Sequence, residues 1–290
     1  MFDNTNEFIA YCKENKKTVA EVSLAKEASF NKTGEEVIIN NLRRILDIME
    51  ESSIEGLDKD MGSMGGLIGR EAKLLEDYRR TGKSLSGDFL ISAVAKALST
   101  SQVNASMGRI VAAPTAGAAG ILPGVLFSIK KKLDLDEDQL VKGLLTASTI
   151  GEIIARKASI SGAEGGCQAE CGSAAAMAAA ALVELSGGTV DQVFHAASFA
   201  LTNIMGLICD PIAGLVEYPC NIRNAMGVTN AYLSADMALA GMESVVSFDE
   251  VVESMKEVGD LMHSSLKETA LGGLVKTDTA LKIKKDLNIK

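Results

Sequence analysis

Hydrophobic residues recur at helical spacing along most of the chain. Between Glu35 and Met49 the apolar positions are 37, 38, 42, 45, 46 and 49, which lie on one face of a helix. No stretch shows the alternation of apolar and polar residues that is typical of a strand, and no repeat has the period of a solenoid. The pattern predicts helices at about 5–15, 19–29, 34–51, 70–81, 87–101, 121–132, 137–158, 170–186, 190–204, 222–241, 248–262 and 264–270.

Four of these helices begin with a capping-box pattern. In a capping box, a hydroxyl and a carboxylate or amide three residues later satisfy backbone N–H groups that the helix leaves free. The pairs are Thr18 with Glu21, Thr33 with Glu36, Thr189 with Gln192, and Ser247 with Glu250.

Gly-rich stretches interrupt the helical pattern at 62–69, 104–124, 159–172 and 206–221. Glycine allows the backbone to approach a ligand closely. Ordinary turns between helices are the alternative interpretation. We predict an all-α fold, a single compact multi-helix domain whose Gly-rich loops together form one site.

Composition agrees with closely packed helices. Hydrophobic residues make up 47% of the 290 residues, while aromatic residues make up 4% and Trp is absent. The formal net charge of −9 argues against a general nucleic-acid surface or an anionic-membrane surface. The lysines near the C-terminus are interpreted as a solvated basic tail, residues 276–290.

Two runs without charged residues, 110–129 and 192–209, are long enough to raise the question of a membrane span. The first contains prolines and glycines and the second contains polar residues, so both fit buried elements better. The first 17 residues carry charges throughout and do not resemble a secretion signal. We therefore expect a cytoplasmic protein whose five cysteines are thiols or ligands rather than disulfides.

Four cysteines fall in two of the Gly-rich stretches. Cys167 and Cys171 are four residues apart, and Cys209 and Cys220 are eleven apart in a segment that also holds two of the four prolines. Thiolate ligands select zinc, copper(I) or iron–sulfur clusters. The alternative is that all four are core cysteines, since free cysteine is often buried. The isolated Cys12 is interpreted as an ordinary thiol.

Other side chains suit an anionic substrate group. The stretch 104–120 could cradle a carboxylate through backbone N–H groups, at Gly108 and Gly117 among others, and through the hydroxyls of Ser106 and Thr115. Arg223 is a further carboxylate candidate, and its alternative is an ion pair with Asp210 or Glu217.

The two histidines favour structural interpretations. His195 lies in an apolar helix and His263 lies near a helix end. A Ser-His-Asp or Cys-His catalytic arrangement cannot be assigned from them.

Several of these motifs together resemble the α, catalytic chain of the bacterial iron–sulfur L-serine dehydratases. The motifs are Ala112–Gly117, Ser161–Glu170, Gly206–Gly214 with Pro219-Cys220 and Arg223–Ala225, and Glu268–Gly273. The resemblance covers roughly residues 60–275 as the catalytic core. Residues 1–59 resemble the same chain's helical lead-in more weakly.

The resemblance implies conversion of L-serine to pyruvate and ammonia in an all-helical catalytic domain. It implies a [4Fe–4S] cluster held by Cys167, Cys209 and Cys220, which leaves one iron open for the substrate. Cys171 departs from the family pattern, where an aliphatic residue is usual. It is either a bystander or a fourth ligand in damaged enzyme, and a position on the first turn of a helix would lower the pKa of its thiol.

The family also implies a partner. Single-chain relatives carry a β domain before this one, so the resemblance points to a hetero-oligomer with a separate β chain. No catalytic base is identified here, and a Ser-Ser-Ser-His motif of the β portion is a candidate source. The alternatives are a cluster-dependent lyase acting on L-cysteine or L-threonine, and a metal-stabilised scaffold subunit without catalysis.

Overall fold

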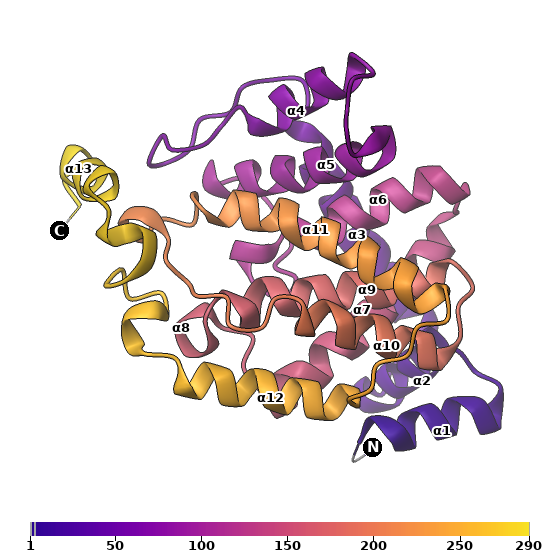
Figure 1. Ribbon diagram of the computed structural model, residues 1–290. Helices are drawn as coiled ribbons and strands as arrows, with labels where there is room; N and C mark the ends of the chain where they lie inside the picture. Colours follow the sequence, from indigo (N-terminus) through magenta and orange to yellow (C-terminus); the bar gives the residue numbers. More distant parts are fainter. Residues whose placement is uncertain (1, 3, 290) are drawn as a thin grey trace.

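Helix α9, Ser173–Leu185, lies at the centre of the molecule (Figure 1). Eleven of its thirteen residues are buried, and most of these are alanines. Four helices pack around it, namely α6 (Ile121–Leu133), α7 (Glu137–Lys157), α10 (Val190–Thr202) and α11 (Cys220–Leu239). Small side chains allow such close approach of helix backbones, so the alanine run explains why this helix is enclosed.

Further helices cover this centre on two sides. Helix α5 (Gly87–Ala105) packs against α6 and α11, and α3 (Glu35–Glu55) and α4 (Glu71–Arg80) pack on α5. At the point where α5 meets the chain entering α6, a Cβ on Gly120 would lie 2.2 Å from the carbonyl oxygen of Ala97. Only glycine fits that contact.

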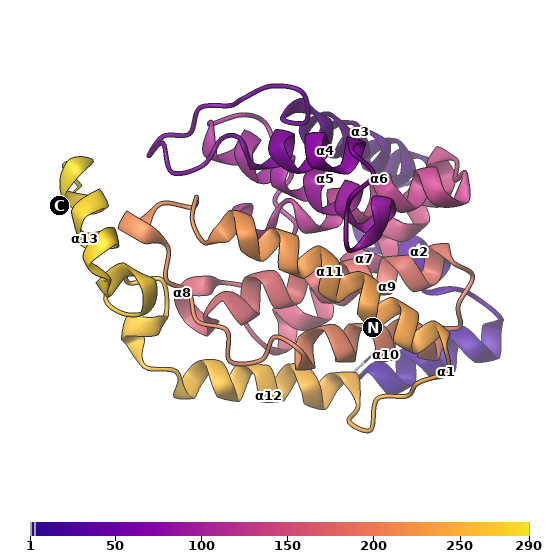
Figure 2. The ribbon, with the colours of Figure 1, turned by 45° about the horizontal axis from the view of Figure 1, so that its top comes forward.

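On the opposite side, three helices complete the body. Helix α2 (Val19–Asn31) packs on α7, while α1 (Thr5–Asn15) and α12 (Phe248–Leu261) pack on α10. Figure 2 shows the same arrangement with α12 running along the edge of the molecule.

The computed structural model describes residue 2 and residues 4–289. Across these residues the chain forms thirteen α-helices and no β-strand, which confirms the all-α prediction. No helix in the described part of the chain has the length and apolar character that crossing a bilayer requires.

Short elements gather at one end of the body, on the left in Figure 1. These are the single turn α8 (Gly162–Gly165), the π-helical turn η2 (Gln168–Gly172), the 3₁₀ turns η1 (Ala116–Ala118), η3 (Ile212–Gly214), η4 (Ser264–Leu266) and η5 (Gly273–Lys276), and helix α13 (Asp278–Asp286). The long loop between α3 and α4 reaches the same end (Figures 1 and 2). All four Gly-rich stretches therefore contribute to one region.

Three of the four expected capping boxes are formed, and one is not. The capping boxes at Thr18, Thr189 and Ser247 are formed. The one expected at Thr33 is wrong, because Gly34 is the N-cap of α3 and no side chain caps it. A further box, Asp136 with Gln139, begins α7.

The C-terminal part differs most from expectation. The helix expected at 264–270 is only the 3₁₀ turn η4, and the expected tail contains helix α13, capped by Thr277. Its buried Ala280 anchors it, while Lys282 and Lys285 are exposed as expected. Lys290 lies outside the described residues.

Candidate functional site

The cysteine segment, residues 209–220, is fixed at its start by backbone pairing. The Cys209 N–H donates to the Leu266 carbonyl at 2.8 Å, and the Glu268 N–H donates to the Cys209 carbonyl at 2.9 Å. The segment ends where Cys220 begins helix α11. Both ends of the segment are thus set by elements that are themselves packed on the body.

A second segment, residues 161–172, brings Cys167, Glu170 and Cys171 to the same place. It runs from α8 into the π-helical turn η2, a conformation that often occurs at functional sites. The fully buried Gln168 holds it, since its Nε2 donates to the Met255 carbonyl at 2.9 Å and its Oε1 accepts from the Gly206 N–H at 2.8 Å. Gln168 therefore connects this segment to the stretch that leads to Cys209.

The four cysteines of these segments are all buried free thiols. The Sγ atoms of Cys167 and Cys171 lie 3.3 Å apart. Hydrogen bonds with Cys171 and Cys209 lower the pKa of Cys167 well below its usual value, and the Arg223 guanidinium adds to this effect. Burial raises the pKa of Cys220 to about 12, and the charge of Cys167 adds to that rise. Electrostatically the four thiols form one group.

The expectation for Cys171 is wrong in one respect. Its hydrogen bond with Cys167 and its burial raise the pKa of the Cys171 thiol well above the usual value, where a helix N-terminus was expected to lower it. Cys171 lies inside the π-helical turn before α9, enclosed on all sides. The thiol whose pKa is lowered is Cys167 instead.

Glu170 joins the cysteines to the loop before α6. Its Oε1 accepts from the Thr115 hydroxyl at 2.8 Å, and its Oε2 lies 3.9 Å from the Cys209 sulfur. A Cβ on Gly162 would lie 2.6 Å from Glu170 Oε2 and 3.0 Å from the Cys209 sulfur, so the backbone at Gly162 packs closely against both side chains. Burial raises the pKa of Glu170 to about 7.

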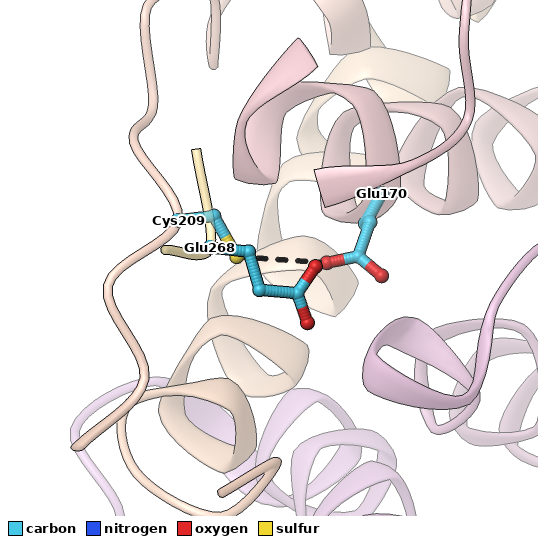
Figure 3. A group of neighbouring side chains, drawn as sticks. All are labelled: Glu170, Cys209 and Glu268. Carbon is cyan, nitrogen blue, oxygen red and sulfur yellow. Dashed lines mark hydrogen bonds between the residues drawn. The ribbon is translucent and has the colours of Figure 1, made fainter. Parts of the chain in front are cut away.

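A second carboxylate, that of Glu268, approaches from the C-terminal stretch (Figure 3). The ligand atoms of Glu170, Cys209 and Glu268 all lie within 4.8 Å of one another. Glu268 has a φ of 57°, a left-handed conformation that costs a non-glycine residue about 1–2 kcal/mol. Two oxygens and one sulfur that converge in this way suit a cation.

Arg223 is engaged within the protein. Its guanidinium donates to Asp210 Oδ1 at 2.6 Å and to the Ile208 carbonyl at 3.0 Å. Asp210 Oδ2 in turn accepts from the Leu274 N–H at 2.7 Å. The ion pair that the sequence left open as an alternative is thus present, and it connects the cysteine segment to the C-terminal stretch.

The predicted substrate residues fall in two places. Thr115 and Gly117 lie beside Glu170, with the position of a Gly117 Cβ only 3.3 Å from Glu170 Oε1. Ser106 and Gly108 follow the end of α5. Their contacts are with Gly62, with Gln102 and with Val103, rather than with the cysteines.

Sequence reasoning missed several polar residues that hold the site. Asn224 donates to the carbonyls of Gly117 and Cys220, at 2.7 and 2.8 Å, and accepts from the Gly120 N–H at 2.9 Å. Asn224 and Glu170 lie inside recognisable motifs, which was the available signal, but nothing in the motifs shows which partner each one has.

The histidines have structural roles, as expected. His195 Nδ1 accepts from the Ser244 N–H at 3.1 Å, and His263 caps the turn η4.

The donor set fits a thiolate-bound group. The Cys209 thiol lowers the pKa of Cys167 and the charge of Cys167 raises the pKa of Cys220, so the three thiols act on one another, and all three are shielded from water. Soft sulfur ligands of this kind suit zinc, copper(I) or an iron–sulfur cluster better than a hard cation. The pair of carboxylates beside Cys209 adds oxygen donors at the edge of this group.

Known proteins are similar over nearly the whole chain. A family model for the serine dehydratase alpha chain matches residues 14–275. The L-serine dehydratase alpha chain of Peptoniphilus asaccharolyticus is 50% identical over 286 residues, which cover 99% of this chain and 98% of that protein. A probable L-serine dehydratase alpha chain of Bacillus subtilis is 46% identical over 287 residues, covering 99% and 95%.

A longer relative matches over only part of its length. The L-serine dehydratase TdcG of Escherichia coli is 36% identical over 283 residues, which cover 94% of this chain but 61% of that protein. Every motif of the candidate site lies within the residues that the family model matches. The chain belongs to the serine dehydratase alpha chain family.

Proposed function

We propose that this chain is the catalytic subunit of an L-serine ammonia-lyase, which converts L-serine to pyruvate and ammonia. The observation that carries the proposal is the convergence of the buried Cys167 and Cys209 with the half-buried Glu170 in one polar site, within motifs of the serine dehydratase alpha chain family. The relatives that match along nearly their full length are named an L-serine dehydratase alpha chain and a probable L-serine dehydratase alpha chain, which supports serine as the substrate.

The cofactor we propose is a [4Fe–4S] cluster held by Cys167, Cys209 and Cys220. When bound, it supplies an iron with an open coordination position that acts as a Lewis acid toward the substrate hydroxyl, which is a poor leaving group. Cys171 is excluded from this ligand set. Three protein thiolates keep one position open, while a fourth would close it.

The protein's own groups bind and orient the substrate. Thr115 and Gly117 lie beside Glu170, and we propose that their loop faces the substrate carboxylate. Arg223 holds Asp210, so its proposed contribution is to fix the cysteine segment and to place positive charge near Cys167. Ser106 and Gly108, in the earlier part of the same stretch, remain candidate substrate-binding residues.

We further propose that a β chain completes the site and supplies the base that removes the Cα proton. The chain corresponds to about three-fifths of the longer relative TdcG, so that relative contains a large additional part. Helix α11, which begins at Cys220, exposes Ile222, Met226 and Leu233 along one face. An exposed apolar face that starts at the site supports a partner docked there.

The proposed compartment is the cytoplasm. Buried thiols that must stay reduced to act as ligands suit a reducing environment, and no disulfide occurs among the described residues.

Anaerobic reconstitution tests the function. Iron and sulfide are added to the purified chain, alone and together with the β chain, and pyruvate formation is followed with serine. Cysteine and threonine serve as competing substrates, since pocket discrimination at the scale of a methyl group is only about 1–3 kcal/mol. We expect turnover of serine, with little activity from the chain alone. Cluster binding without turnover in the complex would favour the scaffold alternative, and a faster reaction with cysteine or threonine would change the substrate.

A further inference from the structure

Glu217 is a buried acid in the middle of the cysteine segment that has no cationic partner among its hydrogen bonds. The residue is 2% exposed, and its carboxylate accepts three hydrogen bonds. The Gly65 N–H donates to Oε1 at 2.6 Å, while the Ser63 hydroxyl and the Leu67 N–H donate to Oε2 at 2.8 and 2.9 Å. Burying a carboxylate is costly unless such donors replace the lost water, so these contacts are specific.

All three donors belong to one loop, residues 61–69, between α3 and α4. Its neck is closed by a hydrogen bond from the Met61 N–H to the Gly69 carbonyl at 2.7 Å. Its tip is mostly exposed, but Gly65 is pressed against the cysteine segment. A Cβ there would lie 2.4 Å from Leu215 Cδ1 and 3.1 Å from Glu217 Oε1. The carboxylate of Glu217 is therefore enclosed by this loop.

The backbone of Glu217 is tied to Cys220. The Glu217 carbonyl accepts from the N–H of Asn221 at 2.9 Å. Asn221 follows Cys220 directly, and this hydrogen bond spans the turn in which Cys220 begins α11. One residue earlier, Val216 approaches to 3.6 Å from where a Cβ on Gly117 would lie. Glu217, which contacts loop 61–69, is thus the sequence neighbour of a residue that approaches the loop of Thr115 and Gly117 beside Glu170.

We propose that Glu217 is a positioning residue that clamps the cysteine segment to loop 61–69 and so holds Cys220 in place before its ligand arrives. Cys209 is fixed by pairing with residues 266–268 and Cys220 begins helix α11, while in the middle of the segment the clamp adds to the hydrogen bond from the Ile212 N–H to the Tyr218 carbonyl at 2.9 Å. A site that is ordered in advance binds its ligand with less loss of conformational entropy. The clamp stands on its contacts alone, and only its consequence for cluster binding rests on the proposed function.

The first test compares Glu217→Gln with wild type as the full-length, metal-free chain. Gln has the same shape, but an NH₂ group replaces one of the two carboxylate oxygens. Because this NH₂ group cannot accept a hydrogen bond, the backbone N–H of either Gly65 or Leu67 loses its acceptor. We expect hydrogen exchange at residues 62–67 and alkylation of Cys220 to become about tenfold faster or more, the range that follows from losing hydrogen bonds to a charged group. Exchange in α9 should not change. Glu257→Gln, at an exposed position on α12, is the matched control for the lost charge. Wild-type rates at both places in Glu217→Gln would overturn the clamp.

The second test approaches the same contact from the loop. Gly65→Ala inserts a methyl group against Leu215 and Glu217, while Gly62→Ala, with no atom within 4 Å of the new Cβ, is its control in the same loop. We expect Gly65→Ala to reproduce the faster exchange and alkylation, and Gly62→Ala to resemble wild type. The double variant with Glu217→Gln should add little, because both changes remove one interaction. Fully additive effects would mean that the two residues act separately.

The third test concerns the ligand. During anaerobic reconstitution of the same variants, the visible absorbance of the cluster should develop about tenfold more slowly in Glu217→Gln than in Glu257→Gln. Equal rates would overturn the positioning role toward the cluster while leaving the clamp intact. If wild type itself takes up no cluster, the proposed function fails, and the exchange and alkylation data still decide the clamp.

Discussion

Two regions of this molecule bury different kinds of side chain. Helix α9 and its neighbours are held by apolar contacts, and from Ser173 to Val183 α9 contains no charged residue. The end of the molecule that carries the cysteines buries Asp210 and Glu217 together with Gln168, Asn221 and Asn224. One region is stabilised by packing, and the other by a set of paired polar groups.

This difference explains why side-chain orientation is defined more precisely at the cysteine end than around α9. Apolar contacts have little directionality, so a core of alanines fixes distances between helices but does not orient a ligand. The five buried polar side chains named at the other end each have a partner at a defined distance, such as Asp210 with Arg223 at 2.6 Å. A fully satisfied polar network orders its members, and a broken one is costly. We therefore expect substitutions at the two ends to fail in different ways.

The largest effect is expected at the proposed ligands. Replacing Cys167, Cys209 or Cys220 by Ala should abolish both the visible absorbance of the reconstituted cluster and pyruvate formation. Far-ultraviolet circular dichroism should remain helical, because the packing around α9 is untouched. Cys171→Ala is the matched control, a buried neighbour of Cys167 that should keep both signals. Loss of the cluster in Cys171→Ala would make it a ligand, and loss of turnover alone would make it catalytic.

The next effect concerns the buried ion pair. Arg223→Met leaves Asp210, whose side chain is 3% exposed, without its cationic partner. Removing one member of a buried pair costs about 3–5 kcal/mol, so the free energy of unfolding in urea should fall by that amount. Lys256→Met removes a pair with Asp260 in which both side chains are more than half exposed, and it should leave the urea midpoint unchanged. Similar losses in both variants would show that burial does not decide the strength of these pairs here.

A smaller effect is expected from overfilling the centre. Ala179 is fully buried in α9, and Leu at this position must displace neighbouring helices. Such overpacking typically costs about 1–3 kcal/mol in the free energy of unfolding. Ala155→Leu, at an exposed position of α7, tests the same substitution without confinement and should stay within about 0.5 kcal/mol of wild type. An unaffected Ala179→Leu would mean that the centre is loosely packed.

Local sequence signals were sufficient for most of the framework. Helical periodicity and capping residues act over three or four positions, so the ranges of α1, α6 and α12 could be read directly. The motifs likewise predicted that the cysteines and the loop of Thr115 belong to one site. Those predictions depend on neighbours in sequence or on long motifs.

The contacts that hold the site could not be predicted in this way. Glu217 meets residues about 150 positions earlier in the chain, and Thr115 meets Glu170 across 55 positions. Such pairings depend on how the helices pack and have no local signature. Helix α13 was missed for a related reason. Its charged composition is typical of a solvated tail, and its order comes from packing near η3 and η5.

The smallest effect tests the capping-box signal that failed at Thr33. Thr189 forms a capping box with Gln192, so Thr189→Ala should lower the free energy of unfolding by about 1 kcal/mol. Thr33→Ala should have almost no effect, because Gly34 is the N-cap of α3 and the Thr33 hydroxyl does not cap that helix. Urea unfolding of the two variants, both at helix starts and both with the same atoms removed, gives the comparison directly. Equal losses would mean that Thr33 does cap α3 in solution, in which case the sequence pattern would be the better guide there.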